Sequence, residues 1–215
     1  MTYLQIVNKI LRRLREREVS SINENAYSAL VGIFVNDAKQ VVEEAWSWSG
    51  LRNTLTANTI DGTFGYELNG SQNNFTMLDA INLTDGTFLH YKSASEYNQM
   101  FNDASPEKGS PYYYSFNGVS PDGDSQVDLY PIPDKAYTLR FNMVQRTPEL
   151  VGESEIFLIP TRPIEILAYA MVVEERGEDG GFNPATAYAL GQTALSDAIA
   201  LDAGKHPEEL VWRVD

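Results

Sequence analysis

Few residues in this sequence could do chemistry. The chain has no cysteine, and its two histidines are His90 and His206. Disulfides, zinc–thiolate sites and cysteine nucleophiles are therefore excluded. Two histidines are also too few for most histidine-based metal sites, and they make a Ser-His-Asp arrangement improbable. We interpret His90 as a surface or interface residue in an alternating strand, and His206 in the tail suggests no chemistry.

The acidic residues form no recognisable catalytic or metal motif. Thirty Asp and Glu residues guarantee many acid pairs, so no single pair indicates a glycosidase. The stretch DGDSQVD, residues 122–128, has carboxylates near calcium-loop spacing. An EF-hand loop needs flanking helices and a bidentate glutamate at its end, and neither is present. We interpret residues 122–128 as a polar hairpin turn, and we expect no metal, no cofactor and no enzyme activity.

Glycines also give no phosphate-binding signature. The stretch GTFGYELNG, residues 62–70, follows a strand-like run. It lacks the Lys-Ser/Thr pair and the following helix of a phosphate-binding loop. No run of about eighteen apolar residues occurs, so we expect no membrane span. The first residues form a charged amphipathic pattern and lack the apolar region of a signal peptide.

The charge of the chain is acidic and unevenly distributed. The net charge is −14, whereas a general duplex-binding protein normally presents a dominant basic surface. Four arginines cluster near the start of the chain: Arg12, Arg13, Arg15 and Arg17. Residues 174–215 hold nine acidic and three basic residues. This separation could give head-to-tail complementarity between copies or partners, and the arginines could contact an acidic partner surface or occasionally DNA phosphate, but a solvated helix face would also explain them.

Both ends of the chain have apolar residues at helical spacing. We predict a first helix over residues 2–18 and a second from residues 23–25 to about residue 48. A third helix follows Pro160 and Pro163 and ends near residue 176. A fourth runs from residues 183–184 to about residue 203.

The central region has the character of a β-sheet. It is rich in Thr, Asn, Gly, Tyr and Phe, and turn signals such as Asp61-Gly62-Thr63 and Asp85-Gly86-Thr87 separate its runs. Residues 93–103 predict a short helix capped by Ser93 or Ser95. The expected strands lie within residues 52–60, 64–69, 75–83, 87–91, 111–118, 125–132 and 136–144.

One stretch in this region predicts a β-hairpin. It is VDLYPIPDKAYTLRF, residues 127–141, with two alternating runs on either side of a Pro-x-Pro-Asp elbow. Pro131 and Pro133 remove ladder donors, which favours an edge or a turn over a central strand. The alternating apolar residues are Val127, Leu129 and Pro131 before the elbow and Tyr137, Leu139 and Phe141 after it.

These elements predict an α+β fold. The helix pairs at the two ends would form a four-helix bundle, and an antiparallel β-rich subdomain would be inserted between them. We expect a discontinuous helical domain of residues 1–50 and 160–203, a β-rich insertion of residues 51–159 and a tail of residues 204–215. The apolar end of the tail could fold back on the domain or dock on another subunit, with Trp212 as the anchor.

The order of these blocks resembles the head-to-tail adaptor proteins of tailed bacteriophages, which are also called connector, head-completion or tail tubular A-type proteins. The resemblance covers most of the chain. The blocks that carry it are TYLQIVNKILRRLRE, EEAWSWSGLRNTLTA, GSPYYYSFNG, VDLYPIPDKAYTLRFNMVQRTPEL and FLIPTRPIEILAYAMVVEE.

The resemblance implies a non-enzymatic structural protein of the virion. Such adaptors are rings, expected to be dodecamers, beneath the portal at one capsid vertex. The implied partners are other copies of the chain, the portal protein and a downstream neck or tail nozzle protein. Genomic double-stranded DNA would pass through the channel without sequence-specific binding. The chain would assemble in the host bacterial cytoplasm and reside in the neck of the virion, with no membrane partner.

The resemblance also implies roles for three groups of residues. By analogy, the tail residues Leu210, Val211, Trp212 and Arg213 are candidates for docking on the portal. The β insert would face the next neck or tail component, with candidate residues Tyr130, Pro131, Pro133 and Asp134. The basic residues Arg12, Arg13, Arg15 and Arg17 would lie on a helix between subunits and meet the acidic last helix of a neighbour.

Two other readings remain open from the sequence. The chain could be a different neck or tail-tube component. The Tyr- and Asn-rich insert would also suit a carbohydrate- or surface-binding module, although the flanking helices would then have no role.

Overall fold

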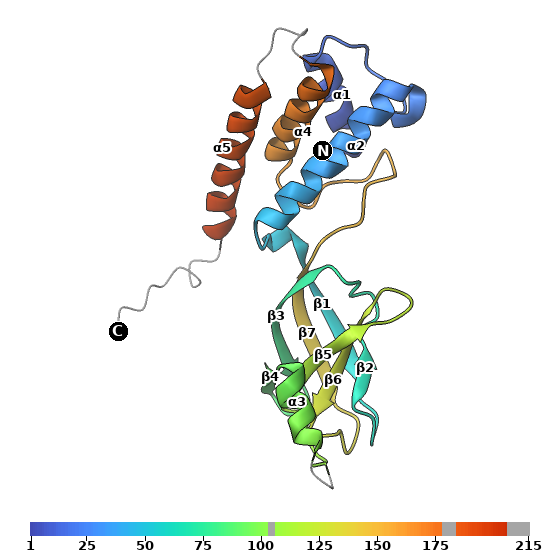
Figure 1. The fold of residues 1–215 in the computed structure, drawn as a ribbon, viewed down its shortest axis with the longest axis vertical. Helices are drawn as coiled ribbons and strands as arrows, with labels where there is room; N and C mark the ends of the chain where they lie inside the picture. Colours follow the sequence, from blue (N-terminus) through green and yellow to red (C-terminus); the bar gives the residue numbers. More distant parts are fainter. Residues whose placement is uncertain (103–105, 178–183, 206–215) are drawn as a thin grey trace, which may run out of the picture. The chain divides into compact units, whose positions relative to one another are not determined.

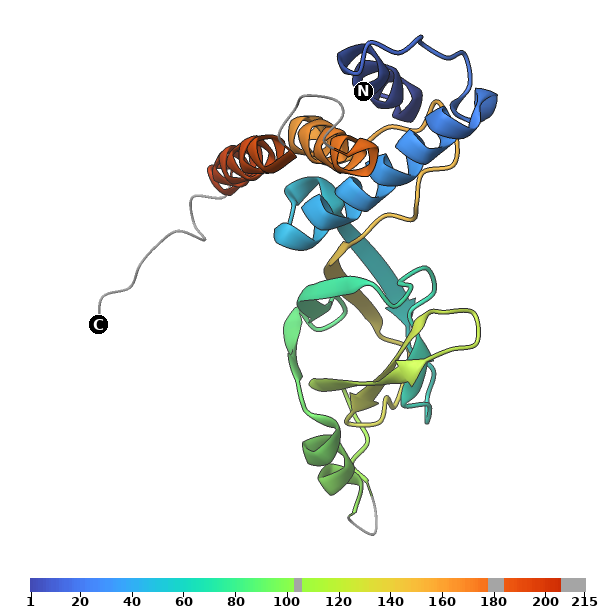
Figure 2. The same ribbon diagram turned by 45° about the horizontal axis from the view of Figure 1, so that its top comes forward.

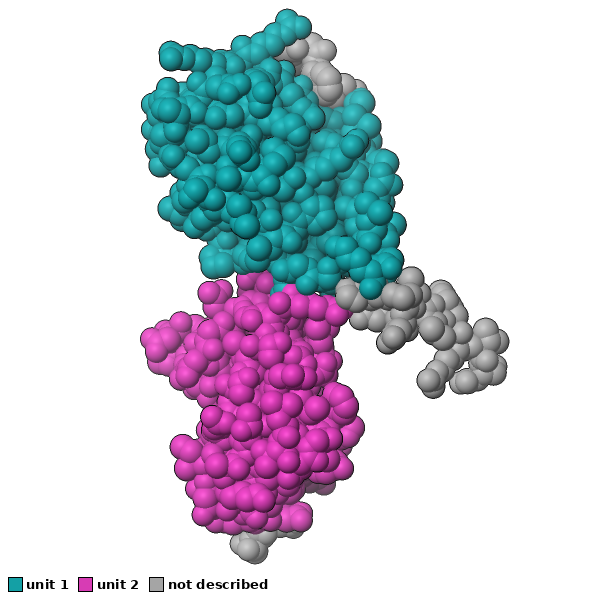
Figure 3. Space-filling model, turned by 180° about the vertical axis from the view of Figure 1, so that it is seen from behind, with its two compact units in different colours: residues 1–51, 147–215 teal, residues 52–146 magenta. Residues whose placement is uncertain are grey.

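The computed structural model describes residues 1–102, 106–177 and 184–205. The chain forms two compact units, coloured separately in Figure 3. The helical unit consists of residues 1–51 and 147–215, and the insert consists of residues 52–146. The fold is therefore α+β, with a sheet inserted between helices from the two ends of the chain.

Helix α1 (Tyr3–Arg13) begins as the sequence indicates but ends earlier than predicted. Thr2 and Gln5 form a reciprocal capping box at its start. The predicted end near residue 18 is wrong, because the chain turns back at Arg15, whose φ is +61°. The side chain of Asn8 bonds both the backbone N–H and the carbonyl of Val19 at 2.9 Å, and this holds the returning chain against the helix.

Helix α2 (Ala26–Ala45) starts at the expected place, ends at Ala45 and not near residue 48 as predicted, and is capped at both ends. The Asn25 side chain accepts a hydrogen bond from the Ser28 N–H at 2.8 Å. At the other end the chain folds back, so that the buried Trp48 indole donates to the Val42 carbonyl at 2.7 Å. This bond satisfies one of the orphan carbonyls of the last turn.

Helices α4 (Thr161–Arg176) and α5 (Pro184–Ala203) match their predicted bounds. Helix α4 lies between α2 and α5 and contacts both, and α1 packs on α2 and α4 (Figures 1 and 2). A Cβ at Gly191 would lie 2.6 Å from Leu167 Cδ2, so α5 approaches α4 closely at this glycine. Helices from both ends of the chain thus pack together, and α5 joins the others chiefly through α4.

In its described residues, the insert contains seven strands and a helix, and every predicted strand run holds one of the strands. The helix is α3 (Ala94–Phe101), capped by Ser93. The strands are β1 (Arg52–Asn58), β2 (Gly65–Glu67), β3 (Phe75–Asn82), β4 (Thr87–Tyr91), β5 (Tyr113–Val119), β6 (Ser125–Tyr130) and β7 (Thr138–Gln145).

The sheet is mixed, where the sequence predicted an antiparallel one. Its strand order is β1-β7-β3-β4-β5-β6-β2, and β4 pairs with β5 in parallel. The reason is the connection between them, which contains α3. A parallel pair needs such a long crossover, whereas a tight hairpin would have made the pair antiparallel.

The predicted hairpin of residues 127–141 is wrong, because β6 and β7 are not neighbours in the sheet. Strand β6 pairs with β5 and β2, and β7 pairs with β1 and β3. The elbow between them bonds to other loops instead. The Ile132 N–H donates to the Glu107 carbonyl at 2.9 Å, and the Pro133 carbonyl accepts from the Gly62 N–H at 2.8 Å.

The alternation in the same stretch predicted the core of the insert correctly. Val127 and Leu129 on β6 are buried in the same cluster as Leu139 and Phe141 on β7. Tyr137 joins them just before β7. Each run therefore buries one face as its period of two indicates, although the two runs belong to separate strand pairs.

Candidate interaction surfaces

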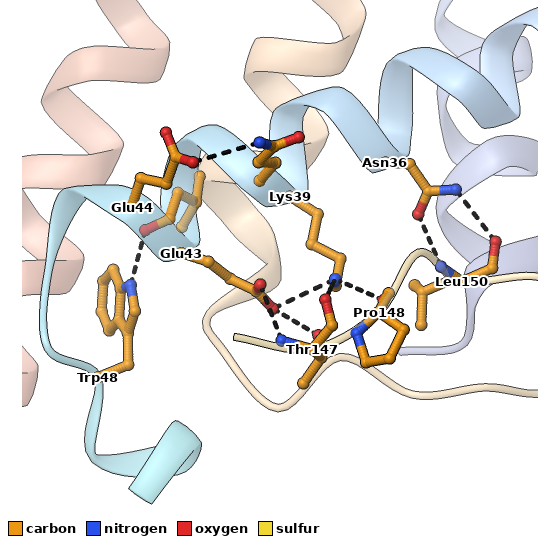
Figure 4. A network of polar contacts seen from close by, with 10 residues as sticks. Asn36, Lys39, Glu43, Glu44, Trp48, Thr147, Pro148 and Leu150 are labelled. Carbon is orange, nitrogen blue, oxygen red and sulfur yellow. Dashed lines mark hydrogen bonds and ion pairs between the residues drawn. The ribbon is translucent and has the colours of Figure 1, made fainter. Parts of the chain in front are cut away.

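Two buried charges on α2 hold the segment that re-enters the helical unit after β7 (Figure 4). Lys39 Nζ lies 3.3 Å from Glu43 Oε1 and donates to the carbonyls of Thr147 and Pro148, each at 2.9 Å. Glu43 in turn accepts from the Thr147 N–H and hydroxyl at 3.2 and 2.6 Å. These partners compensate the burial of both charges and fix the returning chain on α2.

One turn away, Asn36 continues the attachment. Its side-chain amide donates to the Leu150 carbonyl and accepts from the Leu150 N–H, both at 3.0 Å. This pair copies the geometry of a backbone ladder. We call Asn36, Lys39 and Glu43, together with residues 147–150, the re-entry clamp. No sequence pattern indicated it, because the partners are more than 100 positions apart.

A second buried carboxylate engages the basic residues of α1. Glu165 on α4 is buried, and it pairs with Lys9 and Arg13, each at 2.5 Å. The Arg13 guanidinium also lies 5.7 Å from the ring centroid of Tyr169. Two half-exposed cations on one buried carboxylate fasten α1 to α4 within a single copy.

The other predicted arginines lie outside α1 or on its exposed side. Arg12 pairs with Glu18 at 3.0 Å, and both side chains are more than half exposed. Arg15 and Arg17 follow the end of the helix. Arg13, Arg15 and Arg176 line a cavity of about 280 Å³ at this end of the helical unit. The four predicted residues therefore do not share one helix face.

The predicted residues of the elbow are held by short contacts within the insert. The Tyr130 ring packs edge-on against Phe101, with the centroids 5.4 Å apart. Pro131 follows a cis peptide bond, and Pro133 is buried. Asp134 accepts a hydrogen bond from the Tyr137 hydroxyl at 2.7 Å, and this bond raises the pKa of Tyr137 to about 12.

The predicted tail residues Leu210, Val211, Trp212 and Arg213 lie outside the described residues. Within the described ranges, no group of three or more His, Asp or Glu side chains could hold a metal. In the stretch 122–128, Asp124 instead accepts from the N–H groups of Gly70 and Gln72, at 2.9 and 2.8 Å. None of the helices in the described part of the chain is long and apolar enough to cross a bilayer.

The architecture is that of a scaffold: helices from both chain ends, fastened by buried ion pairs, with a curled mixed sheet inserted between them. Comparison with known families identifies the family of this scaffold. Residues 1–209 match the family model described as SU10 adaptor protein, and the chain belongs to that family. The protein is thus a phage head-to-tail adaptor, with a structural and not an enzymatic role. The resemblance seen in the sequence is confirmed. No curated protein matches the chain.

Proposed function

We propose that the chain forms a homo-oligomeric ring, expected to be a dodecamer, beneath the portal in the virion neck. The ring would extend the DNA channel and provide the platform for tail attachment. The observation that carries this proposal is the family match over residues 1–209. Membership in an adaptor family implies interaction with other neck components, and the portal and a downstream nozzle protein are the partners we propose.

The charge of the chain supports a role around DNA. With 30 acidic and 16 basic residues, a ring of copies would carry a strongly negative potential. Phosphate binding needs cations, so an acidic lumen would let the duplex slide without adhering. This is the behaviour expected of a channel and not of a sequence-specific binder.

We assign the helical parts, residues 1–50 and 160–203, to ring formation as one four-helix bundle domain. The inserted subdomain would face the tail; its proposed range, residues 51–159, includes residues 147–150, which the re-entry clamp holds on α2. The elbow of Tyr130, Pro131, Pro133 and Asp134 would stiffen this face, and its bonds to residues 62 and 107–109 support that role.

Two further contacts belong to this proposal. The tail residues Leu210, Val211, Trp212 and Arg213 would dock on the portal, with Trp212 as the apolar anchor. The arginines Arg12, Arg13, Arg15 and Arg17 would contribute to contacts between subunits. Of these, Arg13 already holds Glu165 of its own copy, so its contribution would come from the outer side of its guanidinium.

The test is electron microscopy of the purified chain mixed with the portal protein of the same phage. The proposal predicts an added ring of density on one end of the portal. A portal that shows no added ring would contradict it. Binding assays against the portal and against tail-tube protein would separate the adaptor role from that of another neck or tail-tube component.

A further inference from the structure

Helix α2 has an apolar and acidic face that is exposed among the described residues of its helical unit. Ile33 is 57% exposed and Val41 is 40% exposed. Asp37 lies between them and Glu44 follows, and both are exposed. The spacing of 4, 4 and 3 residues places all four side chains on one side of the helix. We call these four residues the α2 face.

The opposite side of the same helix already forms the core. Val31, Val35, Ala38 and Val42 have no exposed surface. An amphipathic helix at a protein surface normally carries one apolar stripe. A second set of large apolar residues on the other side is typical of a helix with a partner on both sides.

A groove between α4 and α5 is the second exposed feature. Two cavities of about 290 and 620 Å³ adjoin, since both are lined by Arg162, Ala194 and Asp197. At the two ends of the groove, Leu190 is 55% exposed and Leu201 is 75% exposed. We call this feature, which follows α5 from residue 187 to residue 201, the α4–α5 groove.

The two surfaces match in length. From Ile33 to Glu44 the α2 face spans about 17 Å, and the groove spans about 21 Å along α5, at 1.5 Å per residue. An apolar helix face in an apolar groove is a recurrent recognition geometry. A groove between two helices also accepts the ridge of a third by ordinary helix packing.

The charges of the two surfaces are complementary. The charged residues on the α2 face are Asp37 and Glu44, both acidic. Arg162 is exposed at the point where the two cavities join, and Arg13 lines one of them. Asp197 is the exposed acidic residue of the groove, and Lys205, which lies just beyond its far end, pairs with Asp202. Arg13 already pairs with Glu165, so the complementary charges are Asp37, between Ile33 and Val41 on the α2 face, and Arg162, between Leu190 and Leu201 in the groove.

We propose that the α2 face of one copy docks in the α4–α5 groove of a second copy. The inference rests on the proposed ring and names the surfaces that build it. Because the two surfaces are different parts of the same unit, the contact is heterologous, and repeated heterologous contacts close into a ring when the rotation allows. A self-complementary two-fold contact would have required one surface to match itself.

Single-cysteine variants test the contact, because the natural chain has no cysteine. Gln40→Cys places a thiol between Asp37 and Glu44, and Thr193→Cys places one in the groove. Both changes keep the charges of the surfaces. The two variants are mixed, treated with a bis-maleimide linker and analysed by denaturing gel, with and without the portal protein of the same phage.

Cross-linked dimers should be several-fold more abundant in the mixture than in either variant alone. Gln192→Cys is the matched control, because Gln192 is exposed on α5 but does not line the groove. Gln192→Cys mixed with Gln40→Cys should give cross-linked dimer only at the background level. Adding Arg162→Glu to the Thr193→Cys variant should reduce the specific product, whereas adding Gln192→Glu should leave it unchanged.

Three outcomes would overturn the inference. Gln40→Cys could cross-link mainly with itself, which would indicate a two-fold contact. A wild-type ring could form on the portal while the mixture of Gln40→Cys and Thr193→Cys gives no cross-linked dimer. Removal of residues 206–215 could increase maleimide labelling of Thr193→Cys, which would show that the chain's own end occupies the groove. Failure of the proposed function differs from all three, because wild-type protein would then add no ring to the portal.

Discussion

Asp202, at the end of α5, accepts hydrogen bonds from both the backbone N–H and the hydroxyl of Ser49, at 2.9 and 2.6 Å. The two residues are 153 positions apart in the chain. Asp202 is buried, and Lys205 Nζ lies 3.0 Å from its Oδ1 atom. The pair fastens the last helix to the segment that follows α2.

The Asp202–Ser49 pair predicts an acid-sensitive step in stability. Burial alone would raise the pKa of Asp202, but the bonds from Ser49 and Lys205 outweigh it and lower the pKa to about 2, from an ordinary value of 3.8. A lowered pKa stabilises the fold above pH 4, and this contribution is lost as the pH falls from 4 towards 2. The loss is about 2 kcal/mol by linkage.

Urea unfolding between pH 2 and pH 6 measures this step. Asp202→Asn should reduce stability at pH 6 and flatten the slope of the unfolding free energy between pH 4 and pH 2. Asp197→Asn, a change at an exposed position on the same helix, is the control and should keep the wild-type slope. An unchanged slope in Asp202→Asn would contradict the assignment.

The ion pairs of Glu165 predict that removing its two cations costs more stability than removing its carboxylate charge. Replacing both Lys9 and Arg13 by Met leaves a buried carboxylate without a cation, which should cost about 3–5 kcal/mol. Glu165→Gln should cost less, because the two cations are 41% and 42% exposed and remain hydrated. Chemical denaturation measures both variants, and Arg12→Met, at an exposed pair, should cost less than about 1 kcal/mol. Equal losses in the double variant and in Glu165→Gln would refute this account.

The re-entry clamp predicts a large effect of a single apolar substitution. Lys39→Met would leave the buried Glu43 carboxylate without its cation and two carbonyls without their donor, at a cost of about 3 kcal/mol. Gln40→Met, one residue away on the exposed side, should change stability by less than about 0.5 kcal/mol. Hydrogen exchange of the Thr147 and Leu150 amides should accelerate in Lys39→Met. Unchanged exchange there would show that the clamp does not hold this segment.

A close backbone approach predicts a strict requirement for glycine at position 50. A Cβ at Gly50 would lie 2.2 Å from the carbonyl oxygen of Leu158, and a backbone atom cannot rotate away. Gly50→Ala should therefore lower stability by about 2 kcal/mol or more. Gly109→Ala is the matched control, because a Cβ there meets nothing within 4 Å. A thermal midpoint for Gly50→Ala equal to that of Gly109→Ala would disprove the requirement.

Local patterns were sufficient to predict most of the elements. The bounds of α4 and α5 and the positions of the seven strands follow from apolar periodicity and from turn residues such as Gly62 and Gly86, both of which have positive φ. Ser93, one of the two predicted caps, is the N-cap of α3, and Thr2 and Asn25 cap α1 and α2 through the same side-chain chemistry. The end of α1 was predicted too late, because apolar periodicity does not indicate the turn at Arg15 or the hydrogen bonds by which Asn8 holds Val19.

The candidate surfaces were less predictable than the elements. The four arginines near the start of the chain form a basic cluster in the sequence, but the sequence does not show that Arg13 pairs with Glu165, 152 positions away. Ile33 and Val41 of the α2 face stand in the sequence among the other apolar residues of the same helix. Only the packing of α2 against α1 and α4 separates the residues that form the core from those left uncovered.

By itself, the sequence determined the kinds of element, their order and the family, because periodicity, capping and block order are properties of short stretches. The tertiary structure alone decided which strands pair and which charges meet. The residues of β6 and β7 have the alternation of a hairpin, yet the bonds of Ile132 and Pro133 to other loops direct the two strands to different partners. Lys39, Glu43, Glu165 and Asp202 look like surface charges in the sequence. Their burial becomes stable only because distant segments bring hydrogen-bonding partners to them.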